Sequence, residues 1–154
     1  MQLSPDRVRG GKMATAREIM HMGAECIRQN ETLTAAAAKM GDLHVGALPI
    51  LGADDRLHGI ITDRDIVVRA VANGLDPQET TVDMLAERTP IWVDASADIN
   101  DVLQTMEEHK VRRLPVVENQ QVVGVISEAD LATRLGAREI SEFASSVYSA
   151  PPNN

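Results

Sequence analysis

The chain contains the same motif twice. Residues 59–65 read Gly-Ile-Ile-Thr-Asp-Arg-Asp, and residues 124–130 read Gly-Val-Ile-Ser-Glu-Ala-Asp. A Leu-Pro step precedes each copy, at 48–49 and at 114–115, and the register holds apart from one residue lost in between. Internal repetition predicts one structural unit that is built twice. We therefore expect a pseudo-twofold arrangement with paired, related sites.

The residues around the motif predict the same elements in both copies. An apolar stripe with the i, i+3, i+4, i+7 spacing of a buried helix face occurs in each. These stripes are Leu33, Ala36, Ala37 and Met40 in the first copy, and Ile99, Val102, Leu103 and Met106 in the second. A short extended segment precedes each helix, at 25–27 and 91–93. Two strands follow each helix, at 47–51 and 57–61 and again at 114–117 and 122–126. Each copy therefore reads β-α-β-β-α, and the fold class is α/β (α+β).

Caps and turns mark the boundaries of these elements. Thr32 and Asp98 stand before the first helix of each copy as N-caps. Asp54-Asp55 and Asn119-Gln120 supply turns, so each strand pair is expected to be antiparallel. A second helix opens after each motif, with apolar residues facing the core. These residues are Ile66, Val67, Ala70 and Val71 in the first copy, and Leu131 and Leu135 in the second.

Composition excludes several classes of protein. The net charge is −8 and the chain has a single Phe, Trp and Tyr, which argues against nucleic acid as a partner. No apolar run approaches the roughly 18 residues needed to cross a bilayer. Cys26 is the only cysteine, which fits a reducing cytoplasm.

The expected domain division follows from the repeat. A flexible extension (1–13) precedes a first domain (14–75), a linker with a short helix (76–90) and a second domain (91–136). An amphipathic helix (137–148), with a stripe at Ile140, Phe143, Ala144 and Val147, comes before a frayed tail (149–154). The final helix either closes over the core or contributes to a dimer contact.

The doubled pattern resembles a pair of cystathionine-β-synthase (CBS) domains, the arrangement called a Bateman module. The segments 57–67 and 111–116 carry most of the resemblance, which spans about residues 14–136. The chain is also similar to small stand-alone two-CBS proteins of actinobacteria, of the hypoxic response protein type, which implies a stress-response setting. The resemblance implies a non-catalytic regulatory or sensor module. Its clefts would bind an adenosine-containing ligand such as AMP, ATP or S-adenosylmethionine, with no cofactor required.

The positions that match the family's ligand contacts have suitable chemistry. Asp65 and Asp130 each offer two carboxylate oxygens to ribose hydroxyls, through charge-assisted bonds. Thr62 and Ser127 offer hydroxyl groups beside a helix N-terminus, whose N–H groups favour anions. A structural alternative stays open, because Thr62-x-x-Asp65 and Ser127-x-x-Asp130 also match the capping box, which needs no ligand. Ile61, Ile126, Leu48 and Leu114 are expected to flank a purine.

The two copies differ in front of the Leu-Pro step. The second copy has Arg112 and Arg113, whereas the first has Gly46 and Ala47. Arginine binds phosphate through two parallel hydrogen bonds, which glycine and alanine cannot replace. The resemblance implies phosphate contacts at these two positions, which are often basic in nucleotide-binding relatives. The cleft of Asp130 is therefore predicted to be the better phosphate site. A solvated basic face is the alternative reading of the arginine pair.

Catalysis and metal binding receive no support from the sequence. The four histidines (His21, His44, His58 and His109) have no ligand spacing, and no nucleophile–base set or phosphate-binding loop of the Gly-Lys-Ser/Thr type is present. We expect a homodimer with an unidentified protein partner. The rival hypothesis is an interaction protein whose clefts bind no nucleotide, and an enzyme using Asp65 and Asp130 together is the remote third.

Overall fold

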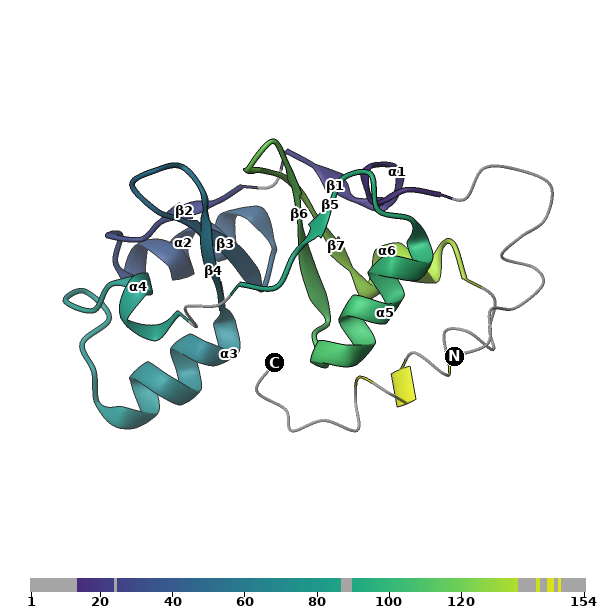
Figure 1. The fold of residues 1–154 in the computed structure, drawn as a ribbon. Helices are drawn as coiled ribbons and strands as arrows, with labels where there is room; N and C mark the ends of the chain where they lie inside the picture. The colour runs from purple at the N-terminus through teal and green to yellow at the C-terminus, as the bar shows by residue number, and fades with distance from the viewer. Residues whose placement is uncertain are drawn as a thin grey trace.

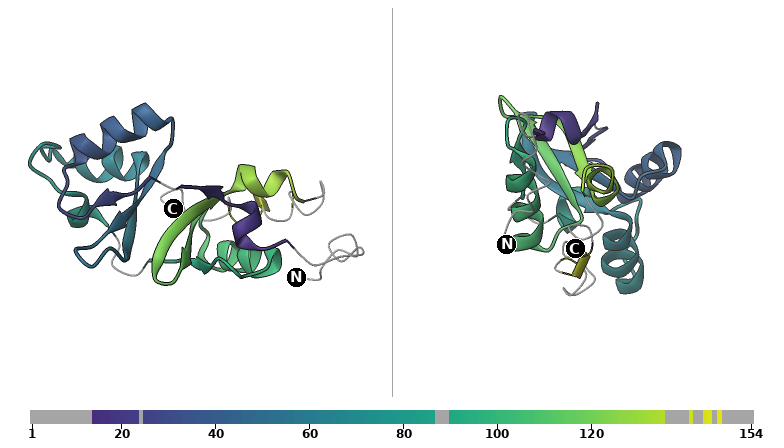
Figure 2. Two further views of the ribbon diagram at one scale, coloured as in Figure 1. Left: turned by 90° about the horizontal axis from the view of Figure 1, so that it is seen from above. Right: turned by 90° about the vertical axis from the view of Figure 1, so that its right-hand side faces the viewer.

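A computed structural model shows two lobes that lie side by side, each made of a small sheet with helices against it (Figure 1; Figure 2). The structure describes residues 14–23, 25–86 and 90–135, together with residues 141, 144, 145 and 147. The expected extension (1–13) and tail (149–154) lie outside the described residues, as does most of the expected final helix. Val147 is described, and it is buried against the core of the second lobe.

Each lobe has the predicted β-α-β-β-α order, so the fold class is confirmed. The first lobe contains β2 (Ile27–Arg28), α2 (Leu33–Leu43), β3 (Ala47–Leu51), β4 (Leu57–Thr62) and one helix made of α3 (Asp63–Asp65), η2 (Ile66–Ala70) and η3 (Val71–Asn73). The second lobe contains β5 (Val93–Asp94), α5 (Ile99–His109), β6 (Arg113–Glu118), β7 (Gln121–Ser127) and α6 (Glu128–Ala132). The remaining elements are α1 (Ala16–Ile19), β1 (His21–Met22) and α4 (Val82–Leu85).

Both hairpins form as the turn residues predict. β3 pairs with β4 and β6 pairs with β7, each antiparallel, whereas β2 and β5 add parallel strands at the edges. Asp55, Asn119 and Gln120 have positive φ angles at the turns. Aspartate and asparagine tolerate this left-handed conformation better than most residues do, because their short side chains bond to the local backbone. The turns and the strand pairing therefore agree with the prediction.

The predicted N-caps are confirmed. Thr32 Oγ1 accepts a hydrogen bond from the Ala35 N–H (3.1 Å), and Asp98 Oδ1 accepts from the Asn100 and Asp101 N–H groups (2.9 and 3.0 Å). Each bond satisfies a donor at the start of a helix that would otherwise have no partner.

The predicted helix stripes are right for the second lobe and partly wrong for the first. Ile99, Val102, Leu103 and Met106 are all buried, but Ala37 is exposed beside its buried neighbours. Val67 and Val71 are also exposed, at 59% and 58%, although the pattern placed them in the core. Ile66 and Ala70, four residues apart, are the residues of this helix that are buried in the first core. The valines therefore fall on the outer side of the helix.

The two entry segments are exchanged between the lobes. α1 precedes the first repeat in the chain, yet Ala16 N–H bonds to the Ala97 carbonyl (2.7 Å), and Ile19 is buried in the second core. α4 precedes the second repeat, yet Val82 N–H bonds to the Glu31 carbonyl (2.9 Å), and Leu85 is buried in the first core. Each lobe is thus completed by a segment from the other side of the chain, and this holds the pair together.

The strand β1 extends this exchange toward the cleft between the lobes. It pairs antiparallel with β7, with His21 opposite Val125 and Met22 opposite Gly124. A Cβ on Gly124 would lie 2.7 Å from the His21 carbonyl oxygen and also against the Met20 sulfur. Glycine at 124 is therefore what allows β1 to lie close against β7.

Candidate functional site

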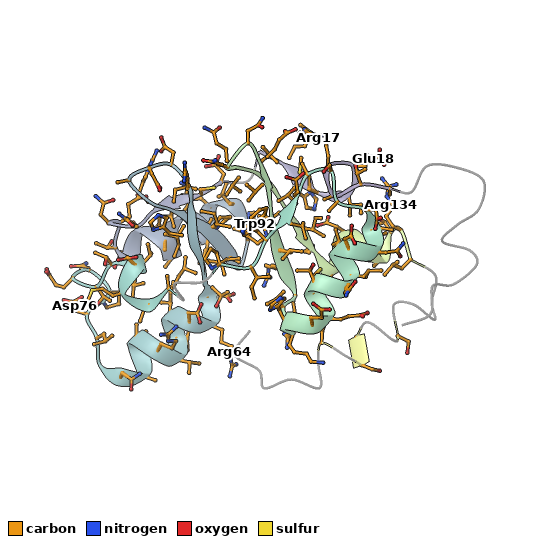
Figure 3. All side chains as sticks on the ribbon, viewed as in Figure 1. Arg17, Glu18, Arg64, Asp76, Trp92 and Arg134 are labelled. Carbon is orange, nitrogen blue, oxygen red and sulfur yellow. The ribbon has the colours of Figure 1, made fainter. Side chains whose placement is uncertain are left out.

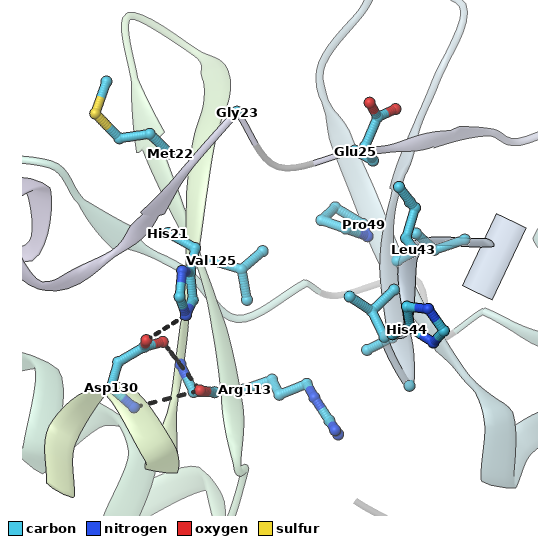
Figure 4. Close-up of a pocket in the computed structure, with 15 residues that line it drawn as sticks. His21, Met22, Gly23, Glu25, Leu43, His44, Pro49, Arg113, Val125 and Asp130 are labelled. Atoms are coloured by element: carbon cyan, nitrogen blue, oxygen red, sulfur yellow. Dashed lines mark hydrogen bonds and ion pairs between the residues drawn. The ribbon is translucent and has the colours of Figure 1, made fainter. Parts of the chain in front are cut away.

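A cleft of about 390 Å³ lies between the lobes (Figure 4). One wall comes from β1, β6, β7 and α6, and the other comes from the end of α2 and the start of β3. Its volume falls within the range of about 300–1,000 Å³ that is usual for small-molecule sites. The cleft is therefore large enough to take a nucleoside-sized ligand.

Asp130 stands at the second-lobe wall of this cleft and is only 9% exposed. Its Oδ2 accepts hydrogen bonds from the Ser127 N–H (2.7 Å) and from the Ser127 hydroxyl (2.9 Å). The Asp130 N–H donates back to Ser127 Oγ at 3.4 Å. The capping box that the sequence left open as an alternative is therefore formed. It uses one carboxylate oxygen and leaves the other, Oδ1, facing the cleft.

Oδ1 of Asp130 is in contact with a histidine from the exchanged strand. His21 Nε2 lies 2.6 Å from it (Figure 4), and the His21 side chain is 81% exposed while the aspartate is buried. The two residues are far apart in the chain, and the sequence assigned His21 to the other repeat. No periodicity or motif links them, because the contact depends on β1 crossing to β7. Sequence reasoning therefore missed His21.

The first-lobe counterpart of this aspartate has a simpler environment. Asp65 Oδ2 accepts from the Thr62 N–H, and the Asp65 N–H donates to Thr62 Oγ1, both at 3.0 Å. This is also a complete capping box. Neither residue lines the cleft of Asp130.

Arg113 reaches across the cleft toward the first lobe. A Cβ added to Gly46 would lie 3.2 Å from Arg113 Nη2 and 3.0 Å from Asp63 Oδ2. A methyl group there would crowd both side chains. The sequence read Gly46 as the loss of a basic residue, and the structure shows that it makes room for the arginine of the opposite repeat.

Three of the six predicted site residues line the cleft, namely Arg113, Ser127 and Asp130. Thr62, Asp65 and Arg112 do not line it. The Arg112 carbonyl instead accepts a hydrogen bond from the Glu128 N–H (3.2 Å). These three residues belong to the cleft that the sequence predicted to be the better phosphate site, and that function stays a prediction.

The predicted purine-flanking residues are mostly placed elsewhere. Ile61, Leu114 and Ile126 are fully buried in the two cores, and only Leu48 reaches the cleft lining. The inward face of each strand packs on its own lobe's helices, so these side chains are already covered. Other apolar side chains line the cleft: Met22, Leu43, Val45, Pro49 and Val125. Met22, Leu43 and Val45 are large and exposed, and so they offer uncovered apolar surface to a ligand.

The part of the chain that the structure describes holds no group of three or more His, Cys, Asp or Glu side chains that could bind a metal ion. None of its helices is long and apolar enough to cross a membrane.

Trp92 lies between the lobes in Figure 3 and is half exposed. At the far edge of the second lobe, Arg134 donates a hydrogen bond to the Glu18 carbonyl (3.3 Å), which ties the end of α6 to α1 (Figure 3).

Comparison with known proteins identifies the repeated unit. A profile of the CBS domain matches residues 16–71 and 82–137, and so it covers most of the chain in two copies. The chain belongs to the CBS domain family. CBS pairs of this type are generally regulatory and non-enzymatic.

Relatives of similar length support the same conclusion. Hypoxic response protein 1 of Mycobacterium tuberculosis is 49% identical over 137 residues, covering 89% of this CBS protein and 96% of the relative. The CBS domain-containing protein YhcV of Bacillus subtilis is 32% identical over 127 residues, covering 82% and 89%. A crystal structure of Hypoxic Response Protein I with two coordinated zinc ions matches with a TM-score of 0.74 at 51% identity, covering 80% of this chain and 100% of that one.

Proposed function

We propose that this CBS pair is a non-catalytic regulatory module that binds an adenosine-containing ligand in the cleft between the lobes. The observation that carries the proposal is the position of Asp130, a buried carboxylate held by Ser127 with one oxygen facing an apolar cleft. That oxygen is suited to accept hydrogen bonds from ribose hydroxyls. A charged acceptor makes such bonds stronger than a neutral one would.

The apolar lining is suited to the base. Leu43, Val45 and Pro49 come from the first lobe, and Met22 and Val125 come from the second. A flat purine between these two groups would cover apolar surface from both lobes at once. Binding would therefore tighten the pair of lobes, which is how a ligand in this cleft would alter association with a protein partner.

We expect a ribose that binds Asp130 to displace His21. The imidazole Nε2 contacts the carboxylate oxygen that the ribose would use, and the backbone of His21 is held by the two-residue pairing of β1. Because the His21 side chain is 81% exposed, it has open space to rotate into. His21 thus acts as an internal competitor for the ligand.

Calorimetric titration with adenosine, AMP, S-adenosylmethionine and ATP tests the proposal, with Asp130→Asn and Asp65→Asn as a matched pair. Both substitutions keep an oxygen for the capping box and remove one charge. We expect Asp130→Asn to weaken binding at least about tenfold, because hydrogen bonds to a charged group contribute about 1.5–3 kcal/mol. Asp65→Asn should leave the affinity within about twofold.

A thermal-shift screen distinguishes the proposed function from the rival hypothesis of an interaction protein that binds no nucleotide. A ligand at 100 times its dissociation constant stabilises the folded state by about 2.7 kcal/mol, which raises the melting temperature measurably. If none of the four compounds shifts the transition, the cleft binds no adenosine compound. The chain is then the interaction protein of the rival hypothesis.

Zinc in the crystal structure of the relative raises the question of a metal here. His21 and Asp130 offer two ligands, whereas structural zinc sites use four protein ligands and catalytic ones use three. The described residues contain no third His, Cys, Asp or Glu close enough to complete such a set. Among the described residues, His21 and Asp130 therefore do not form a complete zinc site. The titrations are made in EDTA so that metal binding does not contribute to the measured affinities.

We also propose that the protein is a cytoplasmic homodimer, with a role in a stress response as the name of its relative suggests. Val67, Val68 and Val71 are exposed on one helix of the first lobe, and they suit a self-complementary contact. Light scattering after size exclusion should give a dimer for the native chain and a monomer for Val67→Lys/Val71→Lys. Ala37→Lys, on an exposed face of α2, is the control. A native chain that is monomeric at every concentration would remove this part of the proposal.

A further inference from the structure

The charges around the cleft do not favour a polyanion. Its lining contains one guanidinium, from Arg113, and two carboxylates, from Glu25 and Asp130. Two histidines, His21 and His44, also line it. Arg113 also has a carboxylate close by, because its Nη2 and Asp63 Oδ2 both lie within 3.2 Å of the position of a Gly46 Cβ. Glu25 lies 3.7 Å from Lys39 Nζ, and Lys39 is engaged with the Cys26 carbonyl at 2.7 Å.

Several of the backbone donors that would receive a phosphate are already used. At the start of α6 the Glu128 N–H bonds to the Arg112 carbonyl (3.2 Å) and the Asp130 N–H bonds to Ser127 Oγ (3.4 Å). α6 has only five residues, so its dipole is small.

The corresponding donors of the first lobe are also used. At the start of α3 the Asp63 N–H bonds to the Gly46 carbonyl (2.9 Å), and the Arg64 N–H bonds to Asp63 Oδ1 (2.8 Å). A ligand phosphate in the cleft would therefore find few unused backbone donors at either helix. It would also meet the field of a chain whose net charge is −8.

We propose that the cleft selects adenosine compounds that carry no phosphate or carry a positive charge, and that it discriminates against ADP and ATP. This inference rests on the proposed function, because it names the ligand class of that site. The ribose contacts Asp130 and the base contacts the apolar lining. Neither contact depends on the substituent at the 5′ position of the ribose. That substituent extends toward Arg113 and Asp63, where the Asp63 carboxylate offsets the attraction of Arg113 for a phosphate. The net negative charge of the chain then adds a repulsion that each further phosphate increases.

The test is a titration series with adenosine, S-adenosylmethionine, AMP and ATP, in EDTA and without magnesium, at low and at moderate salt. We expect S-adenosylmethionine and adenosine to bind tightest, with affinity for ATP lower than that for adenosine by about tenfold or more. The gap should narrow as salt rises, because the repulsion is screened over about 10 Å at 0.1 M.

Asp63→Asn supplies the variant that isolates the charge effect. It keeps an oxygen that can accept from the Arg64 N–H and removes the carboxylate beside Arg113. Affinity for ATP should rise severalfold while affinity for adenosine stays unchanged. Asp83→Asn, an exposed carboxylate on α4 outside the cleft lining, should change neither.

The outcomes separate the two proposals. Binding of ATP as tight as, or tighter than, binding of adenosine overturns the inference and leaves the proposed function standing. An Asp63→Asn variant with an unchanged preference also overturns it. Absence of binding by every compound, to the native chain and to the variants, overturns both.

Discussion

The two lobes share an element order and a complete capping box, and they differ in what surrounds the aspartate of that box. Asp65 has Thr62 as its partner in the box, and it is half buried. Asp130 is buried, faces the cleft and contacts His21 from a strand that belongs to neither hairpin. The repeat therefore determines the fold, and the functional difference comes from the segments added to it.

Arg113, a residue by which the two copies differ in sequence, also depends on the opposite copy for its place in the fold. Arg113 in the second copy and Gly46 in the first line opposite walls of one cleft, and the absence of a side chain at 46 leaves space for the arginine. The two copies are complementary halves of a site here. Comparing them position by position hides this relation, because the halves meet only in the folded pair.

The largest expected effect concerns the exchanged entry segments. Ile19→Ala and Leu85→Ala each remove a large side chain that is 6% exposed, and each should lower the free energy of unfolding by about 2–5 kcal/mol. Hydrogen exchange should then be faster in the lobe on which the residue packs. For Ile19→Ala that lobe is the second, although Ile19 precedes the first repeat. If hydrogen exchange in this variant became faster only in β3 and β4, Ile19 would not pack on the second lobe, and the proposed crossing of the entry segments would be wrong.

The capping boxes should contribute about equally to stability and unequally to binding. Thr62→Ala and Ser127→Ala should each cost about 1 kcal/mol of unfolding free energy, measured by chemical denaturation. Ser127→Ala should also weaken adenosine binding severalfold, because Ser127 holds the Asp130 carboxylate through two hydrogen bonds. Equal loss of affinity in both variants would mean that the two boxes are functionally equivalent.

A smaller effect is expected from the internal competitor. His21→Ala should tighten adenosine binding about two- to fivefold, the factor that corresponds to loss of a competing contact of about 0.5–1 kcal/mol. His58→Ala is the matched control, because His58 Nε2 pairs with Asp54 Oδ1 (3.3 Å) in the hairpin of the first lobe, away from the cleft. Weaker binding by His21→Ala would show that the imidazole contacts the ligand instead of competing with it.

The smallest expected effect concerns Cys26, which takes the place in the first copy that Trp92 takes in the second. Burial raises the pKa of the Cys26 thiol, and the neighbouring Lys39 offsets this only in part. A raised pKa means less thiolate at neutral pH. Alkylation by iodoacetamide should therefore be slow at pH 7.5 and should rise at higher pH than for an ordinary thiol. A rate that reaches its plateau below pH 8.5 would contradict this.

Local chemistry made much of the fold predictable. The caps at Thr32 and Asp98 and the turns at 54–55 and 119–120 depend on residues close in sequence, and all formed as expected. The faces of helices in the first lobe were harder, because Ala37 and Val71 are apolar and yet lie outside the area that the sheet covers. Periodicity gives the spacing of a face and does not give its width.

The candidate site was predictable only in its second-lobe half. Ser127 and Asp130 stand in a repeated motif, and Arg113 stands out by comparison with the other copy. His21, Leu43 and Val45 reach the cleft because β1 crosses to β7 and because the backbone of His44 turns left-handed (φ 56°) at the end of α2. Such long-range pairings leave no pattern in a single sequence.

The central claim is that one cleft, at Asp130, binds the adenosine moiety. The most direct measurement is an NMR titration of the ¹⁵N-labelled chain with adenosine. The amide signals of Gly46, Ser127 and Asp130 should shift in a saturable way, and those of Asp65 and Ile66 should stay in place. Shifts at Asp65 and Ile66 with none at Ser127 and Asp130, or no shift at any of these residues, would contradict the claim.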